Sequence, residues 1–421
     1  MVWEFETDPE FEAHLEWMRA FVEEEVEPLD LLWGELHHAS PPPWLREVID
    51  PLKQQVRDRG LWACHLGPEL GGKGFGQVNL ALMNEILGRT RWGPTIFGTQ
   101  APDTGNAEII ARFGTQDQKK KYLQPLLDGE LFSAFSMTEP QGGADPREFR
   151  CRAYREGQDW VIEGEKFFTS NARNAAFFIV MAVTNPDVDV YKGTSMFLVP
   201  SDTPGIEILR NVGTMGESAG DGVGHAHISY NGVRVPPEAM LGEEGQGFVV
   251  AQSRLGGGRI HHAMRAVGLC NKAFEMMCER ALSRHTQGSL LAEKQLVQQQ
   301  IAESYADIQQ FRLFVLQTAW KIDRHGAAAV RKDIAAAMVQ STKALQSVVG
   351  RAMHIHGALG VSNETPLGRM WMEAPMYGIF DGPTEVHTIT VARQVLREHH
   401  AAPGVWPTRW LPAAAEAARQ K

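Results

Sequence analysis

The chain has 421 residues, of which 41 are basic and 51 acidic, so its formal net charge is −10. A single core rarely grows beyond about 300 residues, so we expect two or three domains. The acidic balance disfavours a nucleic-acid binder, which normally carries a basic surface, but it leaves room for a local basic patch around an anionic cofactor.

The cysteines and the lengths of the apolar runs indicate the cellular compartment in which the protein is expected. The four cysteines, Cys64, Cys151, Cys270 and Cys278, form no C-x-x-C pair, which disfavours a disulfide framework or thiolate metal site and favours a reducing compartment. The N-terminus, MVWEFETDPEFE, lacks the pattern of an export signal. The longest apolar run, Ala175 to Val183, is too short to cross a bilayer. We therefore expect a soluble, cytoplasmic protein without membrane insertion.

The first third of the chain is predicted to be helical. Residues 11–27 carry apolar residues at helical spacing, in a stripe of Phe11, Leu15, Met18 and Val22. Glycine and proline make GPELGGKGFG (67–76) a loop, and a helical pattern resumes over 78–87. The charged stretch GTQDQKKKYLQPLLDGE (114–130) predicts a solvated helix and its exit turn. Contact of Lys119 to Lys121 with an anion is the alternative.

Short β-rich runs cut by turns follow from Phe132 to about Pro237: WVIEGEKFF, FFIVMAVT, SMFLVP, GIEIL and HISYNGVRV. They predict a small sheet sandwich or barrel. Helical periodicity returns at Gly247, and long antiparallel helices of this kind make a bundle. Its two clearest stripes are Ile301, Tyr305, Ile308, Phe311 and Val315, and then Met338, Thr342, Leu345, Val349 and Ala352. The tail after Ala401 is rich in Pro and Ala, with Trp406 and Trp410, and predicts no particular element.

Three segments have the composition of ligand contacts. FSMTEPQGGADP (135–146) has a glycine pair that lets backbone approach a ligand, although alone it is only a turn-rich loop. GEKFFTSNA (164–172) could give an isoalloxazine ring an aromatic wall and donors, or be a core strand with a capped end. In YGIFDGPTEVHTITVAR (377–393), Asp381 precedes a helix expected near Thr384, where a carboxylate is stabilised in any case.

Together the segments occur in the order and at the separations of one family: the chain resembles the acyl-CoA dehydrogenases from about Glu10 to Glu398. The resemblance includes PELGGKGFG, SRHTQG (283–288) and HIHGALG (354–360). APDTGN (101–106), RLGGGRIHHAMRAVG (254–268), MCERA (277–281) and DGPTEVH resemble the branch of acyl-CoA dehydrogenase family members ten and eleven. The resemblance to this family implies an α+β fold with an N-terminal helical domain (1–131), a middle β domain (132–246), a C-terminal four-helix bundle (247–400) and a tail (401–421).

The resemblance implies FAD between the β domain and the bundle. Phe135, Met137 and Thr138 would run along the flavin ring, with Thr138 near its N5 edge. Phe168 would stack beside the ring and Ser170 would donate near it. The family often has Trp and Thr at these last two positions, so both are conservative departures.

A second group would reach the FAD of a neighbouring subunit. Arg284 and Thr286 would meet the pyrophosphate, because a planar guanidinium pairs with phosphate oxygens. The HIHGALG loop would also contact FAD from the neighbour. These contacts predict a homo-oligomer, a dimer or tetramer. The remaining cofactor positions carried over are Ala144, Gln295, His354, Gly357, Ala358, Pro383 and Glu385.

Asp381 stands at the position of the family's catalytic base. The base takes the α-proton of an acyl thioester while the β-hydrogen leaves as hydride to flavin N5, and an enolate-like transition state is stabilised at the thioester oxygen. Family members usually have Glu here, and Asp is shorter by roughly 1.5 Å. Because a shift of about 1 Å can cost on the order of 100-fold, the loop must hold Asp381 nearer the substrate. Pro383 replaces the usual Thr, and Glu385 is the next candidate base.

Four residues are carried over as substrate contacts. Arg259 aligns with an arginine near the base and acyl pocket, with a structural ion pair as the alternative. Gly256 belongs to the turn near CoA, and Gly382 follows the base. Ala144, where the family often has Ser, weakens one substrate hydrogen bond.

A metal site and two other functions are the alternatives to this assignment. The pairs His261-His262 and His354/His356 lack a third ligand at plausible spacing, so we expect no metal site. A flavin oxidase or monooxygenase of the same fold, such as a nitroalkane oxidase, also has an Asp base. A DNA-associated flavoprotein is disfavoured by the net charge of −10.

The resemblance also implies a metabolic role. The substrate would be an acyl-CoA of fatty acid β-oxidation, and electron-transfer flavoprotein or a similar protein would accept the electrons. Chain length is not given by the sequence; the related branch suggests long or 4-hydroxylated acyl groups.

Overall fold

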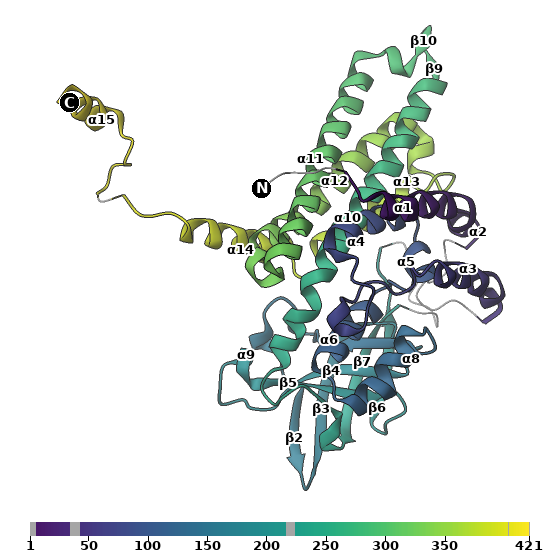
Figure 1. Ribbon diagram of the computed structural model, residues 1–421, viewed down its shortest axis with the longest axis vertical. Coiled ribbons are helices and arrows are strands. Elements are labelled where there is room, and N and C mark those ends of the chain that lie inside the picture. Colours follow the sequence, from purple (N-terminus) through teal and green to yellow (C-terminus); the bar gives the residue numbers. More distant parts are fainter. Residues whose placement is uncertain (1–5, 34–42, 216–223, 403, 421) are drawn as a thin grey trace.

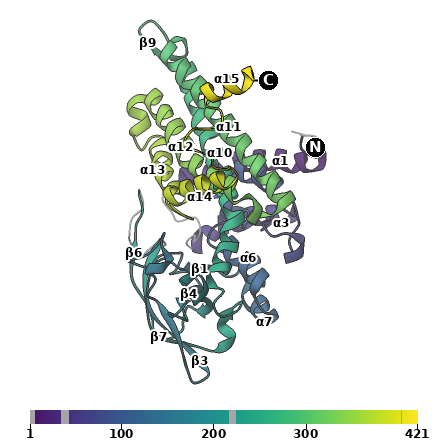
Figure 2. The same ribbon diagram turned by 90° about the vertical axis from the view of Figure 1, so that its left-hand side faces the viewer.

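The computed structural model describes residues 6–33, 43–215, 224–402 and 404–420. Helices, a β sheet and further helices follow one another along the chain, which confirms the predicted order (Figure 1). The sheet occupies one end of the long axis and the helix bundle the other (Figure 2). The boundaries near residues 131, 246 and 400 stay predictions.

The N-terminal region is helical, as predicted. Asp8 caps the first helix by accepting hydrogen bonds from the amides of Glu10 and Phe11. The predicted stripe from Phe11 to Val22 is buried against α4 and the α5 region. The elements are α1 (Pro9–Phe21), η1 (Val22–Val26), α2 (Glu27–Trp33), η2 (Pro43–Leu45), α3 (Arg46–Asp58), η3 (Pro68–Leu70), α4 (Gly76–Leu87), α5 (Gly93–Ile96), α6 (Asp103–Phe113), α7 (Gln116–Gln118), η4 (Lys119–Leu123) and α8 (Gln124–Leu127).

The middle region is an eight-stranded sheet in the order β6-β7-β3-β2-β4-β5-β8, with β1 pairing β4 in parallel. Alternate residues of β4 enter two different cores, Phe178 and Val180 one and Phe177 and Ile179 the other. A strand buried on both faces reads as a continuous apolar run. The strands are β1 (Ser133–Ser136), β2 (Arg152–Glu156), β3 (Asp159–Ser170), β4 (Phe177–Val183), β5 (Thr194–Pro200), β6 (Ile206–Val212), β7 (His225–Val235) and β8 (Met240–Leu241); between them lie η5 (Pro146–Glu148), α9 (Val190–Gly193) and η6 (Pro237–Ala239).

The C-terminal region is a bundle built on three long helices. The predicted stripe of α12 is buried throughout, whereas Tyr305 of the α11 stripe is 58% exposed. The elements are α10 (Gly247–Ser283), β9 (His285–Thr286), β10 (Ser289–Leu290), η7 (Leu291–Glu293), α11 (Gln295–His325), η8 (Ala327–Val330), α12 (Arg331–His356), η9 (Gly357–Val361), α13 (Leu367–Glu373), η10 (Ala374–Gly378), α14 (Thr384–Arg397) and α15 (Leu411–Arg419).

Helix α10 contacts all three regions, and glycines let α4 approach its backbone closely. A Cβ on Gly268 would lie 2.1 Å from the carbonyl oxygen of Glu85, and one on Gly88 would lie 2.3 Å from that of Arg265. Only glycine tolerates such contacts.

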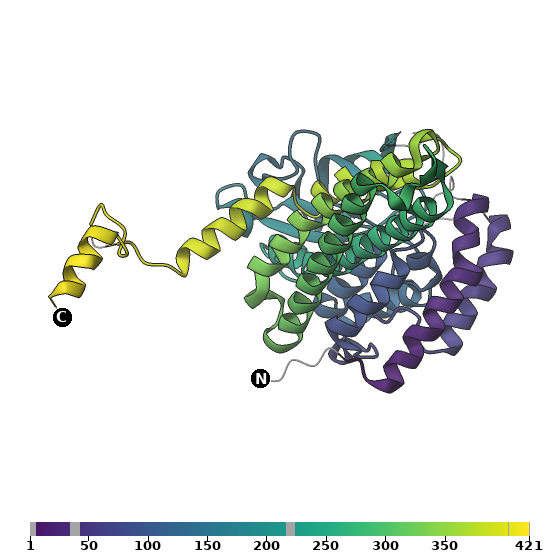
Figure 3. The ribbon, with the colours of Figure 1, turned by 90° about the horizontal axis from the view of Figure 1, so that it is seen from above.

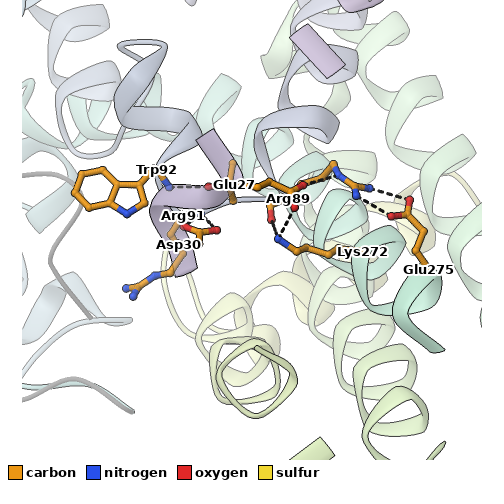
Figure 4. A network of polar contacts seen from close by, with 8 residues as sticks. Glu27, Asp30, Arg89, Arg91, Trp92, Lys272 and Glu275 are labelled. Atoms are coloured by element: carbon orange, nitrogen blue, oxygen red, sulfur yellow. Dashed lines mark hydrogen bonds and ion pairs between the residues drawn. The ribbon is translucent and has the colours of Figure 1, made fainter. Parts of the chain in front are cut away.

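Ion pairs fix the same helices to each other (Figure 4). Arg89 donates to Glu27 at 3.0 Å and binds both carboxylate oxygens of Glu275 on α10, at 2.8 and 2.7 Å. Lys272 of α10 donates to Glu27 at 2.9 Å and to the carbonyl of Arg89 at 3.0 Å. The N-terminal helices therefore hold the part of α10 beyond the candidate site in a fixed place.

Helices α14 and α15 extend from the body on the side opposite α1 and α2 (Figure 3). Helix α15 has no buried residue, and the rings of Trp406 and Trp410 stack on each other with centroids 4.8 Å apart. Among the described residues, no helix is both long and apolar enough to cross a membrane.

Candidate active site

The segment after β1 is fixed to β3 by a buried charge pair. Lys166, with a side chain 0% exposed, donates to Glu139 and to the carbonyl of Met137, each at 2.8 Å. The amide of Phe167 donates to the carbonyl of Thr138 at 2.8 Å. Glu139 also accepts from two backbone amides at the approach to β2. Since both charges are paired and hydrogen-bonded, the backbone at Met137 and Thr138 has one defined path.

A bulge at the end of β3 turns Phe168 outward. The pairing of β3 with β7 shifts register between Lys166 and Thr169, and Phe168 has a φ of +53°. Its ring is 45% exposed and meets the Phe167 ring edge-on at 4.5 Å. The Ser170 hydroxyl is 2.8 Å from Nδ1 of His225. A bulge commonly re-aims a side chain next to a site, and here it presents an aromatic face.

Arg254 of α10 connects β1 with α6. Its guanidinium lies 4.2 Å from the centre of the Phe135 ring and donates to Asn106 at 3.0 Å. Asn106 donates to the Ser133 hydroxyl at 2.9 Å, and Ser133 donates from its amide and hydroxyl to Asp103. Burial raises the pKa of Asp103 to about 6. The APDTGN segment thus orients the arginine through buried hydrogen bonds.

Asp381 lies in a strained loop whose backbone accepts hydrogen bonds from α10. Its φ is +55°, in the left-handed region that a non-glycine residue occupies only when its surroundings impose it. Arg259 donates from Nε and Nη2 to the carbonyl oxygen of Asp381, at 3.0 and 2.7 Å. Burial lowers the pKa of Arg259, and the negative charge of Asp381 opposes that shift. Arg259 therefore contacts the backbone of the candidate base rather than its carboxylate.

The carboxylate faces an uncharged histidine. Nε2 of His262 lies 3.6 Å from Oδ2 of Asp381, and both side chains are 21% exposed. Burial lowers the pKa of His262 to about 4, even with Asp381 opposing the shift. The contact is therefore not an ion pair at neutral pH. The negative charge of Asp381 also opposes the shift that burial imposes on the pKa of Arg254, so the two groups are electrostatic neighbours.

The other predicted positions near Asp381 lie in the same loop or at exposed sites. Gly382, with a φ of +111°, and Pro383, the residue before α14, continue the loop. Glu385 and Ala144 are exposed. Gly256 falls within α10, but its surroundings lie outside the described residues.

The remaining predicted cofactor residues are not brought to this site within one chain. Arg284 directly follows α10, 25 residues beyond Arg259, which is roughly 37 Å along a helix. Thr286 and Gln295 are exposed at the same tip of the bundle, far from the sheet (Figure 1). The exposed residues His354, Gly357 and Ala358 lie at the end of α12. The predicted site residues therefore form separate groups on one chain.

Arg254, His262, Asn106 and the Lys166–Glu139 pair were not predicted as site residues. All of them fall in segments that carried the family resemblance, but their roles depend on contacts between residues far apart in sequence. Among the described residues, no group of three or more His, Cys, Asp or Glu could hold a metal ion.

The middle region fits a flavin. Phe168 offers an exposed aromatic face, and the side-chain hydroxyl of Thr138 bonds to no residue that the structure describes. Arg254 adds a cation beside β1. An aromatic wall with polar groups at its edge is what an isoalloxazine ring requires.

Comparison with known proteins identifies the family. Three family models match consecutive parts of the chain: the acyl-CoA dehydrogenase N-terminal domain over residues 8–130, the middle domain over 134–233 and the C-terminal domain over 245–396. The chain belongs to the acyl-CoA dehydrogenase family, whose members are flavoproteins.

Individual relatives agree with this assignment. The chain is 43% identical to the probable acyl-CoA dehydrogenase FadE2 of Mycobacterium tuberculosis, over 86% of this chain and 88% of that protein. It is 39% identical to human acyl-CoA dehydrogenase family member 11 over 83% of this chain, but spans only 45% of that relative's length. A putative acyl-CoA dehydrogenase from Mycobacterium abscessus matches with a TM-score of 0.87 and 36% identity, covering 94% of this chain and all of the other.

Proposed function

We propose that this chain is an FAD-dependent dehydrogenase that converts an acyl-CoA thioester to the trans-2-enoyl-CoA. The observation that carries the proposal is the position of Asp381, whose backbone is held by α10. Its backbone carbonyl accepts two hydrogen bonds from Arg259, and its side chain faces His262. A carboxylate on a loop held by α10, the helix whose Arg254 also contacts the Phe135 ring of the middle region, suits abstraction of a weakly acidic α-proton.

In this proposal each residue of the loop has one task. Asp381 accepts the α-proton at a carboxylate oxygen, and the amide of Gly382 would donate to the thioester carbonyl as negative charge develops there. Arg259 keeps the base in place through its carbonyl. FAD, when bound, supplies the acceptor for the β-hydrogen as hydride.

The cofactor would be held by two groups of residues. Phe135, Met137, Thr138, Phe168 and Ser170 would surround the ring, where the buried Lys166–Glu139 pair fixes the backbone. The exposed group at the bundle tip, with Arg284 and Thr286, would bind the pyrophosphate of a neighbouring subunit's FAD. This division makes the active form at least a dimer, with electron-transfer flavoprotein or a similar protein as its acceptor.

Cofactor release and anaerobic reduction test the proposal. The purified protein should release FAD, rather than FMN, on denaturation. Under argon, a panel of acyl-CoA esters should bleach the bound flavin and yield enoyl-CoA detectable by mass spectrometry, while nitroalkanes should not. Bleaching by nitroalkanes alone would instead identify an oxidase of this fold, and release of FMN would overturn the cofactor assignment.

A further inference from the structure

Nothing in the proposed mechanism uses His262, although it is the side chain that faces the carboxylate of Asp381. It projects from α10, three residues after Arg259, and so from nearly the same face of that helix. Its ring packs on Phe380 with centroids 4.8 Å apart, and on Tyr377 at 6.4 Å. The imidazole therefore has a defined orientation before any substrate arrives.

Charge decides what this imidazole can do. Burial holds the pKa of His262 at about 4, and the neighbouring cations Arg265 and Arg254 lower it further against the opposing effect of Asp381. An imidazole with so low a pKa cannot keep a proton taken from substrate at neutral pH. It can donate a hydrogen bond from Nε2, the nitrogen that faces the carboxylate.

The 3.6 Å separation between Nε2 of His262 and Oδ2 of Asp381 is longer than a hydrogen bond. Catalytic contacts are often long in free enzymes and shorten when substrate binds. A short Asp side chain makes this contact consequential, because Arg259 fixes only the carbonyl of Asp381 and leaves its side-chain rotation free.

We propose that His262 is a positioning residue, which donates from Nε2 to Oδ2 of Asp381 and fixes the carboxylate rotamer that reaches the α-proton. The proposal rests on the proposed function, with Asp381 as the base. Arg259 and His262 then hold the two ends of one residue from a single helix. His262 would contact neither substrate nor flavin.

Two substitutions of His262 distinguish hydrogen-bond donation to Asp381 from ring packing against Phe380. His262→Phe keeps a ring against Phe380 but removes the donor, whereas His262→Gln places an amide N–H near the position of Nε2. His261→Phe is the matched control, because it replaces the adjacent histidine of α10, which is not paired with Asp381. All variants should be purified with FAD, and their flavin content and Tm compared with those of the parent.

The rate of anaerobic flavin reduction by saturating acyl-CoA should fall about 10- to 100-fold in His262→Phe, in line with a carboxylate displaced by about 1 Å. The apparent dissociation constant for acyl-CoA should change less than about threefold, and the isotope effect of α-deuterated substrate should rise. His262→Gln should recover most of the rate, and His261→Phe should keep it. These outcomes cannot come from a merely structural role.

A His262→Phe variant that reduces flavin as fast as the parent would overturn the positioning role while leaving the proposed function intact. Equal losses in His262→Gln and His262→Phe would also overturn it, because packing would then explain both. A parent protein whose flavin no acyl-CoA reduces would overturn the proposed function and this role with it.

Discussion

At the scale of single residues, buried charges fix the backbone on which the candidate site is built. The Lys166–Glu139 pair is the clearest case, since neither side chain has appreciable contact with solvent. Removing one partner of such a pair leaves an uncompensated charge, which costs about 3–5 kcal/mol. The pair also fixes Met137 and Thr138, so its loss should reach the flavin.

Lys166→Met should therefore lower the free energy of unfolding by about 3–5 kcal/mol and reduce the amount of FAD bound at purification. Urea titration and flavin absorbance measure the two effects. Lys192→Met, at an exposed lysine of α9 in the same region, should change neither. Adding Glu139→Gln to Lys166→Met should restore part of the stability, because it removes the unpaired buried carboxylate. A double variant no more stable than Lys166→Met would contradict this account of the ion pair.

Residue roles could be predicted from sequence only where one segment carried them. Asp381 was singled out because its segment resembles a family motif, and Arg259 because it aligns with a family arginine. Neither pattern shows that Arg259 binds the backbone carbonyl of Asp381 or that His262 faces the carboxylate. These contacts join α10 to a loop more than a hundred residues further along the chain, and no local pattern in the sequence predicts them.

At the scale of elements, the close approach of α4 to α10 sets where Arg254, Arg259 and His262 project. The contact depends on Gly268, where a Cβ would lie 2.1 Å from the carbonyl oxygen of Glu85. Helical periodicity predicted α10, but it could not show which glycines meet another backbone. The same limit explains Tyr305, whose spacing matched the apolar stripe of α11 although the side chain is 58% exposed.

Gly268→Ala should destabilise the protein by about 1–3 kcal/mol, because two helix backbones must move apart. Gly350→Ala is the matched control within α12, since its Cβ would meet only Nε1 of Trp371, at 3.9 Å. Without a clash, alanine in a helix interior should be neutral or stabilising by up to about 1 kcal/mol. Thermal unfolding measures both, and equal Tm values for the two variants would contradict the packing described here.

At the scale of the whole molecule, the order of helices, strands and helices could be predicted because each element's periodicity is local. Strand order and the parallel pairing of β1 with β4 could not, because they depend on contacts between distant segments. The separation of the predicted cofactor residues along α10 favours an assembly of subunits. Light scattering should show the flavin-loaded protein as at least a dimer, and a flavin-loaded monomer would contradict the shared site.

Buried histidines should make the whole fold sensitive to acid. Burial lowers the pKa of His65 to about 4, of His261 to about 3 and of His262 to about 4, from an ordinary value near 6.5. Below about pH 6.5 the unfolded chain binds protons that the folded chain does not, so the free energy of unfolding should fall as the pH drops from about 6.5 toward 4. Asp103, whose pKa is raised to about 6, opposes this over part of the range.

The contribution of one histidine can be isolated by comparing urea midpoints of the parent and His65→Leu at pH 7.5 and pH 5. The parent should lose more stability between the two pH values than the variant, which has one such group fewer. Equal losses in both proteins would show that His65 does not stay neutral in the folded state.

If Asp381 is the base of a flavin-dependent acyl-CoA dehydrogenation, Asp381→Asn should abolish flavin reduction by substrate. The amide is nearly isosteric with the carboxylate but cannot accept the α-proton, so the loss should fall on the chemical step. Anaerobic rapid mixing with acyl-CoA should show full FAD content and essentially no flavin reduction, while Asp381→Glu keeps a reduced but measurable rate. Flavin reduction in Asp381→Asn as fast as in the parent would show that Asp381 is not the base and would make Glu385 the next candidate.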